Sequence, residues 1–232
     1  LGRSVAVKIL RTLNSHTPEV RHPEEHRARL LRESRSLARV VHPNVVSIFD
    51  VGETETEGLV FLVMELLEGG TLREWLRAAP RSFDDVVRMF EPIGQGLAAA
   101  HSAGLVHRDF KPENVILGKD GQPRITDFGL ARGEASLPDG EPSAASSSPP
   151  HEPVRALTPT GDLLGTPAYM SLEQLYGQTA DARADQFAFA VALWEALFGA
   201  RPFAGETLAE LAVDIDQRRY RDTTDHPHSP ER

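Results

Sequence analysis

Three stretches in the first third of the chain concentrate apolar residues in the way that strands do. Residues 4–10 (SVAVKIL) form a short apolar run with one charge, Lys8, and we expect a buried strand there. Residues 45–51 and 59–65 are rich in β-branched and aromatic side chains, which favour strands. The beginning of the chain therefore predicts a small β-rich region.

Helical periodicity appears between these strands, over residues 23–40. Four positions recur at the spacing i, i+3, i+4 and i+7, which places them on one face of a helix. These positions are Leu30, Glu33, Ser34 and Leu37. We expect this face, including the acidic side chain of Glu33, to point inward.

Helical patterns dominate the rest of the chain. Thr71 is typical of an N-cap and predicts a short helix that reaches residue 79. Residues 182–198 are almost wholly apolar, which indicates a central buried helix, and residues 207–215 favour a weaker last one. Residues 84–101 predict a long helix with four inward positions: Val87, Phe90, Leu97 and His101.

Two short strands at 115–117 and 124–126 complete the predicted elements. Because strands come first and helices later, the fold class is α+β. A segment at 134–157 is rich in Ser and Pro and has no hydrophobic period, which indicates a disordered or mobile insertion. The tail, residues 216–232, is polar and predicts irregular structure.

Composition excludes several classes of protein. A net charge of -9 argues against nucleic acid as a partner, because phosphate backbones attract basic surfaces. The chain has no cysteine, which rules out disulfides and thiolate metal sites and suits a cytoplasmic location. No apolar run approaches the roughly 20 residues of a membrane-spanning helix. Lysine occurs only at Lys8, Lys111 and Lys119.

The strongest candidate chemistry lies in two neighbouring motifs. Residues 107–114 read HRDFKPEN, and residues 127–129 read DFG. Phosphoryl transfer needs an acceptor for a hydroxyl proton, a cation near the phosphate and oxygen ligands for Mg²⁺. These motifs supply each of them: Asp109 as the base, Lys111 as the cation, and Asn114 with Asp127 as the metal ligands. A lone His-Arg-Asp is more often a surface salt bridge, but here all four residues occur in order.

From residue 6 to about residue 211, the chain resembles the protein kinase family. The resemblance implies a two-lobed fold with a β-rich small lobe and a helical large lobe. It also implies that Lys8, in VAVK, grips the α- and β-phosphates of ATP and forms an ion pair with Glu33. From the residues alone, Lys8 also fits a charged residue that prevents an edge strand from pairing with another sheet. Glu33, between two leucines, also fits a residue at the boundary between core and surface.

The same resemblance implies an adenine pocket around residues 64–67. The backbones of Glu65 and Leu67 would meet the adenine edge, with Met64 behind it. Ala6 and Ile116 would enclose the ring from its two faces. All of these residues also fit an ordinary core, because nucleotide pockets are lined by core residues.

Further residues carry the resemblance to the serine/threonine branch and to the eukaryotic-type kinases of bacteria. Lys111 follows the base by two residues, and GTPAY at 165–169 implies that Thr166 contacts the base and Lys111. By the same carry-over Asp185 anchors the catalytic loop, residues 107–114, although an acidic residue there also fits the helix dipole. The resemblance also implies that Glu173 has a structural role, as the partner of an arginine in later helices. Finally, it implies that Thr158 and Thr160 carry activating phosphates.

The chain also departs from the family pattern, and we expect it to be a fragment. We assign residues 1–67 to the small lobe and hinge, and residues 68–215 to the large lobe. The glycine-rich loop would precede residue 4, where only Leu1-Gly2-Arg3 stand, and the late helices that supply the cation for Glu173 are not recognisable. Both lobes are therefore expected to be incomplete.

The sequence leaves two functions open. The first is an active serine/threonine kinase that uses ATP and Mg²⁺ on protein substrates and pairs with a second copy for autophosphorylation. The second is a truncated or inactive nucleotide-binding signalling module. A small-molecule phosphotransferase is weaker, since it predicts neither Lys111-Pro112 nor the segment at 165–167.

Overall fold

The structure is a computed structural model that describes residues 2–10, 23–54, 59–129 and 167–223. These residues belong to two compact units, Leu1–Gly133 and Glu134–Arg232. The lobe boundary expected after residue 67 lies inside the first unit. The expected insertion at 134–157 lies outside the described residues.

The first unit begins with a three-stranded antiparallel sheet. Its strands are β1 (Val5–Leu10), β2 (Ile48–Glu53) and β3 (Val60–Glu65), in the order β1-β3-β2. In this register Ala6 lies opposite Met64, and Lys8 lies opposite Leu62. All three strands were predicted, with boundaries that differ by at most three residues.

The prediction that β1 is a buried strand is wrong for one of its two faces. Val5, Val7 and Ile9 are 37%, 58% and 56% exposed, whereas Leu10 is buried. Successive side chains of a strand point to opposite faces, so a continuous apolar run does not show that both faces are covered. Among the described residues, β1 pairs only with β3.

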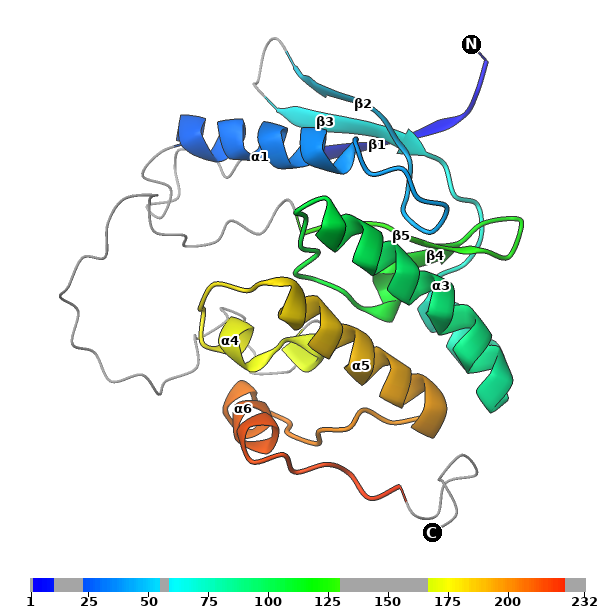
Figure 1. The fold of residues 1–232 in the computed structure, drawn as a ribbon, viewed down its shortest axis with the longest axis vertical. Coiled ribbons are helices and arrows are strands. Elements are labelled where there is room, and N and C mark those ends of the chain that lie inside the picture. Colours follow the sequence, from blue (N-terminus) through cyan, green and yellow to red (C-terminus); the bar gives the residue numbers. More distant parts are fainter. Residues whose placement is uncertain (1, 11–22, 55–58, 130–166, 224–232) are drawn as a thin grey trace, which may run out of the picture. The chain divides into compact units, whose positions relative to one another are not determined.

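Helix α1 (Pro23–Leu37) packs against β2 and β3 (Figure 1). Leu30, Ser34 and Leu37 are buried and Glu33 is partly buried, which confirms the predicted inward face. The helix ends three residues earlier than expected, where Val40 N–H bonds to the Leu37 carbonyl at 3.0 Å in a turn.

Side-chain caps begin the next two helices. Thr71 caps α2 (Leu72–Ala78) as predicted, in a capping box with Glu74. Helix α3 (Phe83–Ser102) begins with a second capping box, between Ser82 and Asp85.

The inward face of α3 is not quite the predicted one. Phe90 and Leu97 are buried as expected and His101 is half-buried, but Val87 is 41% exposed. Val86 is buried instead, because it lies four residues before Phe90 on the same helical face, while Val87 is turned about 100° further round the axis.

A hairpin of β4 (Val115–Leu117) and β5 (Pro123–Ile125) follows a short 3₁₀ turn, η1 (Pro112–Asn114). Helix α3 packs against β5 at Gly96, where a Cβ atom would stand 2.8 Å from the Asn44 carbonyl oxygen and 3.0 Å from Ile125 Cδ1. This close approach holds the strand that leads directly to residue 127.

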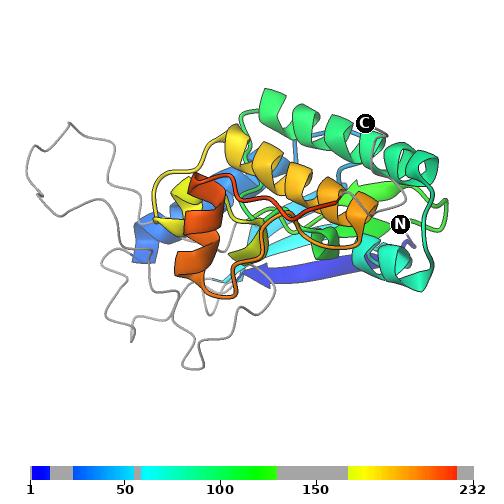
Figure 2. The same cartoon turned by 90° about the horizontal axis from the view of Figure 1, so that it is seen from below.

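The second unit contains η2 (Pro167–Tyr169), α4 (Leu172–Leu175), α5 (Ala182–Phe198) and α6 (Leu208–Asp216). Helix α4 lies beside α6 (Figure 2). Helix α5 has the predicted bounds, begins at an Asp181 N-cap and ends at Gly199, whose φ of 68° suits glycine. Among the described helices, none is long and apolar enough to cross a membrane.

The packing at Gly96 generates a stability prediction. Alanine is a better helix former than glycine by about 1 kcal/mol, yet Gly96→Ala should lower the free energy of unfolding by about 1–3 kcal/mol through overpacking. Gln95→Ala, at an exposed position of the same helix, should change it by less than about 0.5 kcal/mol. Denaturant unfolding of both variants checks this. A Gly96→Ala protein more stable than the parent would contradict the packing described here.

Candidate active site

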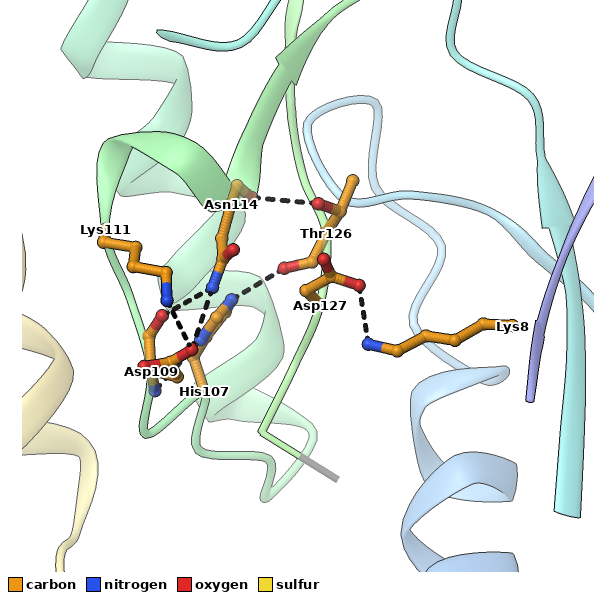
Figure 3. A network of polar contacts seen from close by, with 7 residues as sticks. All are labelled: Lys8, His107, Asp109, Lys111, Asn114, Thr126 and Asp127. Atoms are coloured by element: carbon orange, nitrogen blue, oxygen red, sulfur yellow. Dashed lines mark hydrogen bonds and ion pairs between the residues drawn. The ribbon is translucent and has the colours of Figure 1, made fainter. Parts of the chain in front are cut away.

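A buried histidine joins the two motifs. The ring nitrogen Nε2 of His107 lies 2.8 Å from the Thr126 carbonyl oxygen, and Nδ1 lies 3.3 Å from the Asp109 amide nitrogen (Figure 3). Because an amide N–H can only donate, Nδ1 accepts and Nε2 carries the proton that goes to Thr126. The imidazole thus links Asp109 to Thr126, the residue directly before Asp127.

Backbone contacts make a second connection between the same segments. Gly129 N–H donates to the His107 carbonyl at 2.8 Å, and a Cβ atom at residue 129 would stand 2.8 Å from that oxygen. Thr126 donates to the Asn114 carbonyl from its N–H at 2.8 Å and from its hydroxyl at 3.2 Å. The ring of Phe128 packs on the His107 ring, with centroids 4.6 Å apart.

Two residues of these segments have left-handed backbone conformations. Arg108 has φ 63° and Asp127 has φ 56°, which is uncommon for residues other than glycine and costs of order 1–3 kcal/mol each. Each of them is next to a residue that forms the histidine connection. The surrounding hydrogen bonds therefore hold strained backbone where the polar side chains converge.

Asp109 lies between an amide and an ammonium group. Lys111 Nζ donates to the Asp109 carboxylate at 3.1 Å. Asn114 Nδ2 donates to the Asp109 carbonyl at 2.7 Å and to its carboxylate at 3.3 Å. The three side chains are partly or largely buried, so water screens the charges of Asp109 and Lys111 only in part. The structure brings the predicted base, cation and amide together.

Lys8 and Glu33 do not form the ion pair that the family resemblance implied. Lys8 Nζ lies 2.6 Å from Asp127 Oδ1, and Arg108 Nη1 lies 3.9 Å from Glu33 Oε1. In this structure Asp127 is the carboxylate within reach of the ammonium group, while α1 presents Glu33 to Arg108. The prediction of a direct Lys8–Glu33 pair is wrong for this arrangement.

The donor set fits a hard divalent cation such as Mg²⁺. Asn114 uses its amide nitrogen toward Asp109, which leaves its carbonyl oxygen as the end suited to a cation. Asp127 adds a carboxylate that is 48% exposed. Among the described residues there is no cluster of three or more His, Cys, Asp or Glu side chains, and Mg²⁺ needs only one or two carboxylates.

The residues expected around adenine belong to β1, β3, β4 and the segment after β3. Ala6 and Met64 are paired opposite each other in the sheet and are both partly exposed. Ile116, in β4, and Leu67, after β3, are also partly exposed. Glu65 ends β3, and its N–H donates to the Ser47 carbonyl at 2.9 Å.

The remaining predicted residues divide into two groups. Thr158, Thr160 and Thr166 lie outside the described residues. In the second unit, Asp185 is buried in the first turn of α5. Glu173, in α4, borders a cavity of about 390 Å³ that Asp181 and Arg183 also line.

The sequence placed His107 in a motif and Thr126 at the end of a predicted strand, and gave neither of them a role. The signal for His107 was its place at the head of the HRD motif after the apolar pair at 105–106. For Thr126 the signal was its position directly before DFG. Neither signal shows that the His107 ring meets the Thr126 backbone carbonyl, since this depends on the fold.

The comparison with known families agrees with this geometry. The family model described as "Protein kinase domain" matches residues 2–231. The chain therefore belongs to the protein kinase family. The small antiparallel sheet and the helices that follow it confirm the α+β class.

The chain is similar to serine/threonine-protein kinases of bacteria. It is 39% identical over 223 residues to "Serine/threonine-protein kinase PknL" of Mycobacterium tuberculosis (strain CDC 1551 / Oshkosh), covering 94% of this chain and 49% of the relative. It is 37% identical over 217 residues to PknA of M. tuberculosis (strain ATCC 25177 / H37Ra), covering 92% and 45%. "Probable serine/threonine-protein kinase pknA2" of Bifidobacterium longum is 38% identical over 212 residues, covering 91% and 25%. The chain thus spans half the length of these relatives or less.

Proposed function

We propose that this chain transfers the γ-phosphoryl group of ATP to serine and threonine hydroxyls of protein substrates. The observation that carries the proposal is the hydrogen-bond network around Asp109. Lys111 and Asn114 both donate to Asp109, and the Asn114 carbonyl accepts from Thr126, the residue directly before Asp127. A carboxylate fixed beside a cation suits deprotonation of an alcohol next to a phosphate.

In the proposed reaction, Asp109 accepts the hydrogen bond of the substrate hydroxyl and takes its proton as the new O–P bond forms. The bond between the γ-phosphorus and the bridging oxygen breaks, and ADP leaves with the bonding electrons. Lys111 lies next to the carboxylate and stabilises the negative charge on the transferred group.

The nucleotide would be held by residues on both sides of this carboxylate. Lys8 would contact the α- and β-phosphates, while Asn114 and Asp127 would provide oxygen ligands for Mg²⁺. When bound, the metal neutralises phosphate charge. Adenine would lie between Ala6 and Ile116, with its edge on the backbones of Glu65 and Leu67 and with Met64 behind it.

Residues outside the catalytic network complete the proposal. Thr166 would contact Asp109 and Lys111 and favour aliphatic hydroxyls. Asp185 would anchor the catalytic loop, and Glu173 would stabilise the segment that receives the protein substrate. Autophosphorylation would bring two copies of the domain together.

One observation favours the alternative, a nucleotide-binding module without turnover. Glu33 pairs with Arg108 instead of Lys8, so the ammonium group of Lys8 is not oriented by α1. An active enzyme must then exchange these two pairs when it binds ATP, whereas an inactive module keeps them.

Three substitutions in the full-length protein test the proposed roles. Asp109→Asn should lower turnover by about 10²-fold or more and leave ATP affinity nearly unchanged, because this residue does not hold the nucleotide. Lys8→Met should abolish turnover through loss of phosphate positioning. Lys119→Met is the matched control and should change nothing, since the ion pair of Lys119 with Glu68 is exposed.

Phosphate incorporation from radiolabelled ATP into a generic protein, followed by phosphoamino acid analysis, is the measurement. We expect phosphoserine and phosphothreonine and no phosphotyrosine. An Asp109→Asn protein with most of its activity would exclude Asp109 as the base. ATP binding without turnover in the parent would support the inactive module.

Regulation by phosphorylation is a separate prediction. A phosphate on Thr158 or Thr160 adds a charge of about -1.5 to -2, which Arg108 of the catalytic loop could bind. Mass spectrometric mapping after incubation with ATP should therefore find phosphate on one or both threonines. Phosphate confined to serines 143–148 would refute the idea, because it would lie in the Ser/Pro-rich insertion alone.

A further inference from the structure

An arginine on β5 connects the β4–β5 hairpin to the end of β3. The Arg124 guanidinium donates to both carboxylate oxygens of Asp120, at 3.0 and 2.8 Å. Its Nε lies 3.5 Å from Glu65 Oε1, and its side chain is only 18% exposed. One rigid, planar cation therefore joins the hairpin turn to the last residue of β3.

The charges of Arg124 and Asp120 persist over the pH range in which a phosphotransfer assay is run. Hydrogen bonding to Arg124 and to the Gln122 amide lowers the pKa of Asp120 to about 2. The hydrogen bond with Asp120 in turn raises the pKa of Arg124, and the Glu65 carboxylate adds to this effect. Since a lowered acid pKa keeps the carboxylate ionised until the pH falls to about 2, neutral and mildly acidic buffers leave the pair intact.

The backbone beyond Glu65 is fixed to the same hairpin. Leu117 N–H donates to the Gly70 carbonyl at 2.9 Å, and Thr71 forms a β-bridge with Ile116. At Gly69 a Cβ atom would stand 1.8 Å from the Leu117 carbonyl oxygen, so only glycine allows this approach. The far end of the segment that follows β3 is therefore held by backbone contacts.

Between these two attachments lie residues 66–68, which have no regular secondary structure. Leu66 is 43% exposed, and Leu67 is partly exposed. Connecting segments without regular structure are more mobile than the elements they join, so their position depends on how their ends are attached. The end at residue 71 is attached to the hairpin by the backbone. At residue 65 the N–H is bonded to the Ser47 carbonyl of the sheet, and the arginine attaches the Glu65 side chain to the hairpin.

We propose that Arg124 is a positioning residue for nucleotide binding, which sets the place of the Glu65–Leu67 backbone through its ion pair with Glu65. The inference rests on the proposed function, in which this backbone meets the adenine edge. Arg124 itself need not touch the nucleotide. It acts through the position of two backbone groups, so its loss should weaken ATP binding and spare the phosphoryl-transfer step at Asp109.

The test compares variants of the full-length protein. Arg124→Met keeps the apolar stem and removes the guanidinium group, and we expect the dissociation constant of ATP to rise about 3- to 10-fold while kcat at saturating ATP stays within about twofold. Arg124→Lys should restore part of the affinity, because an ammonium group keeps the charge without the planar fork. Lys119→Met removes the exposed ion pair that joins the same hairpin to Glu68 and is the matched control; it should leave ATP affinity unchanged, because an exposed pair holds the segment only weakly.

A double-substitution cycle separates this role from simple loss of stability. If Arg124 acts through Glu65, Arg124→Met should have little further effect on ATP affinity in a Glu65→Gln background. Equal affinity for ATP in Arg124→Met and the parent would overturn the inference. So would a parallel fall in kcat and melting temperature, which indicates general unfolding.

Lys8→Met shows whether the nucleotide site itself is correctly placed. Weakened ATP binding in Lys8→Met with no effect of Arg124→Met refutes the positioning role alone. Unchanged ATP binding in both variants refutes the proposed nucleotide site and the positioning role together. Calorimetric titration with ATP and Mg²⁺ gives each of these affinities without relying on turnover.

Discussion

The hydrogen bonds of one buried imidazole support the polar network of this kinase domain. His107 accepts from the Asp109 N–H and donates to the Thr126 carbonyl, so it fixes Asp109 on one side and the strand end before Asp127 on the other. Without the ring, a buried carbonyl would have lost its donor, at a cost of about 1–3 kcal/mol. The strained backbones at Arg108 and Asp127 persist because this network holds them.

Much of the fold could be predicted because its signals are local. A capping residue such as Thr71, or the apolar run at 182–198, specifies an element through neighbours in sequence. The errors concern faces: Val87 and the outer side of β1 proved exposed. Periodicity shows which residues share a face, but the partner that covers a face is a tertiary contact. The same limit applies to Gly96, whose close approach to Asn44 has no local signature.

The candidate site was predictable in its residue types and only partly in its contacts. Asp109, Lys111 and Asn114 lie within six consecutive positions, so their proximity follows from a short loop. The pairing of Lys8 spans 119 residues and could not be read in the same way, because several carboxylates compete for one ammonium group. Glu33 and Arg124 belong to this second class, in which geometry decides the partner.

His107 joins the two motifs as a neutral ring with its proton on Nε2. The ¹⁵N chemical shifts of the histidine ring, measured by NMR on histidine-labelled protein, test this directly because they distinguish the two neutral tautomers from the imidazolium. A His107→Phe sample assigns the resonance among the nine histidines. The two hydrogen bonds predict the Nε2–H tautomer at neutral pH. A ring protonated on Nδ1 could not accept the Asp109 N–H, and that result would contradict the account.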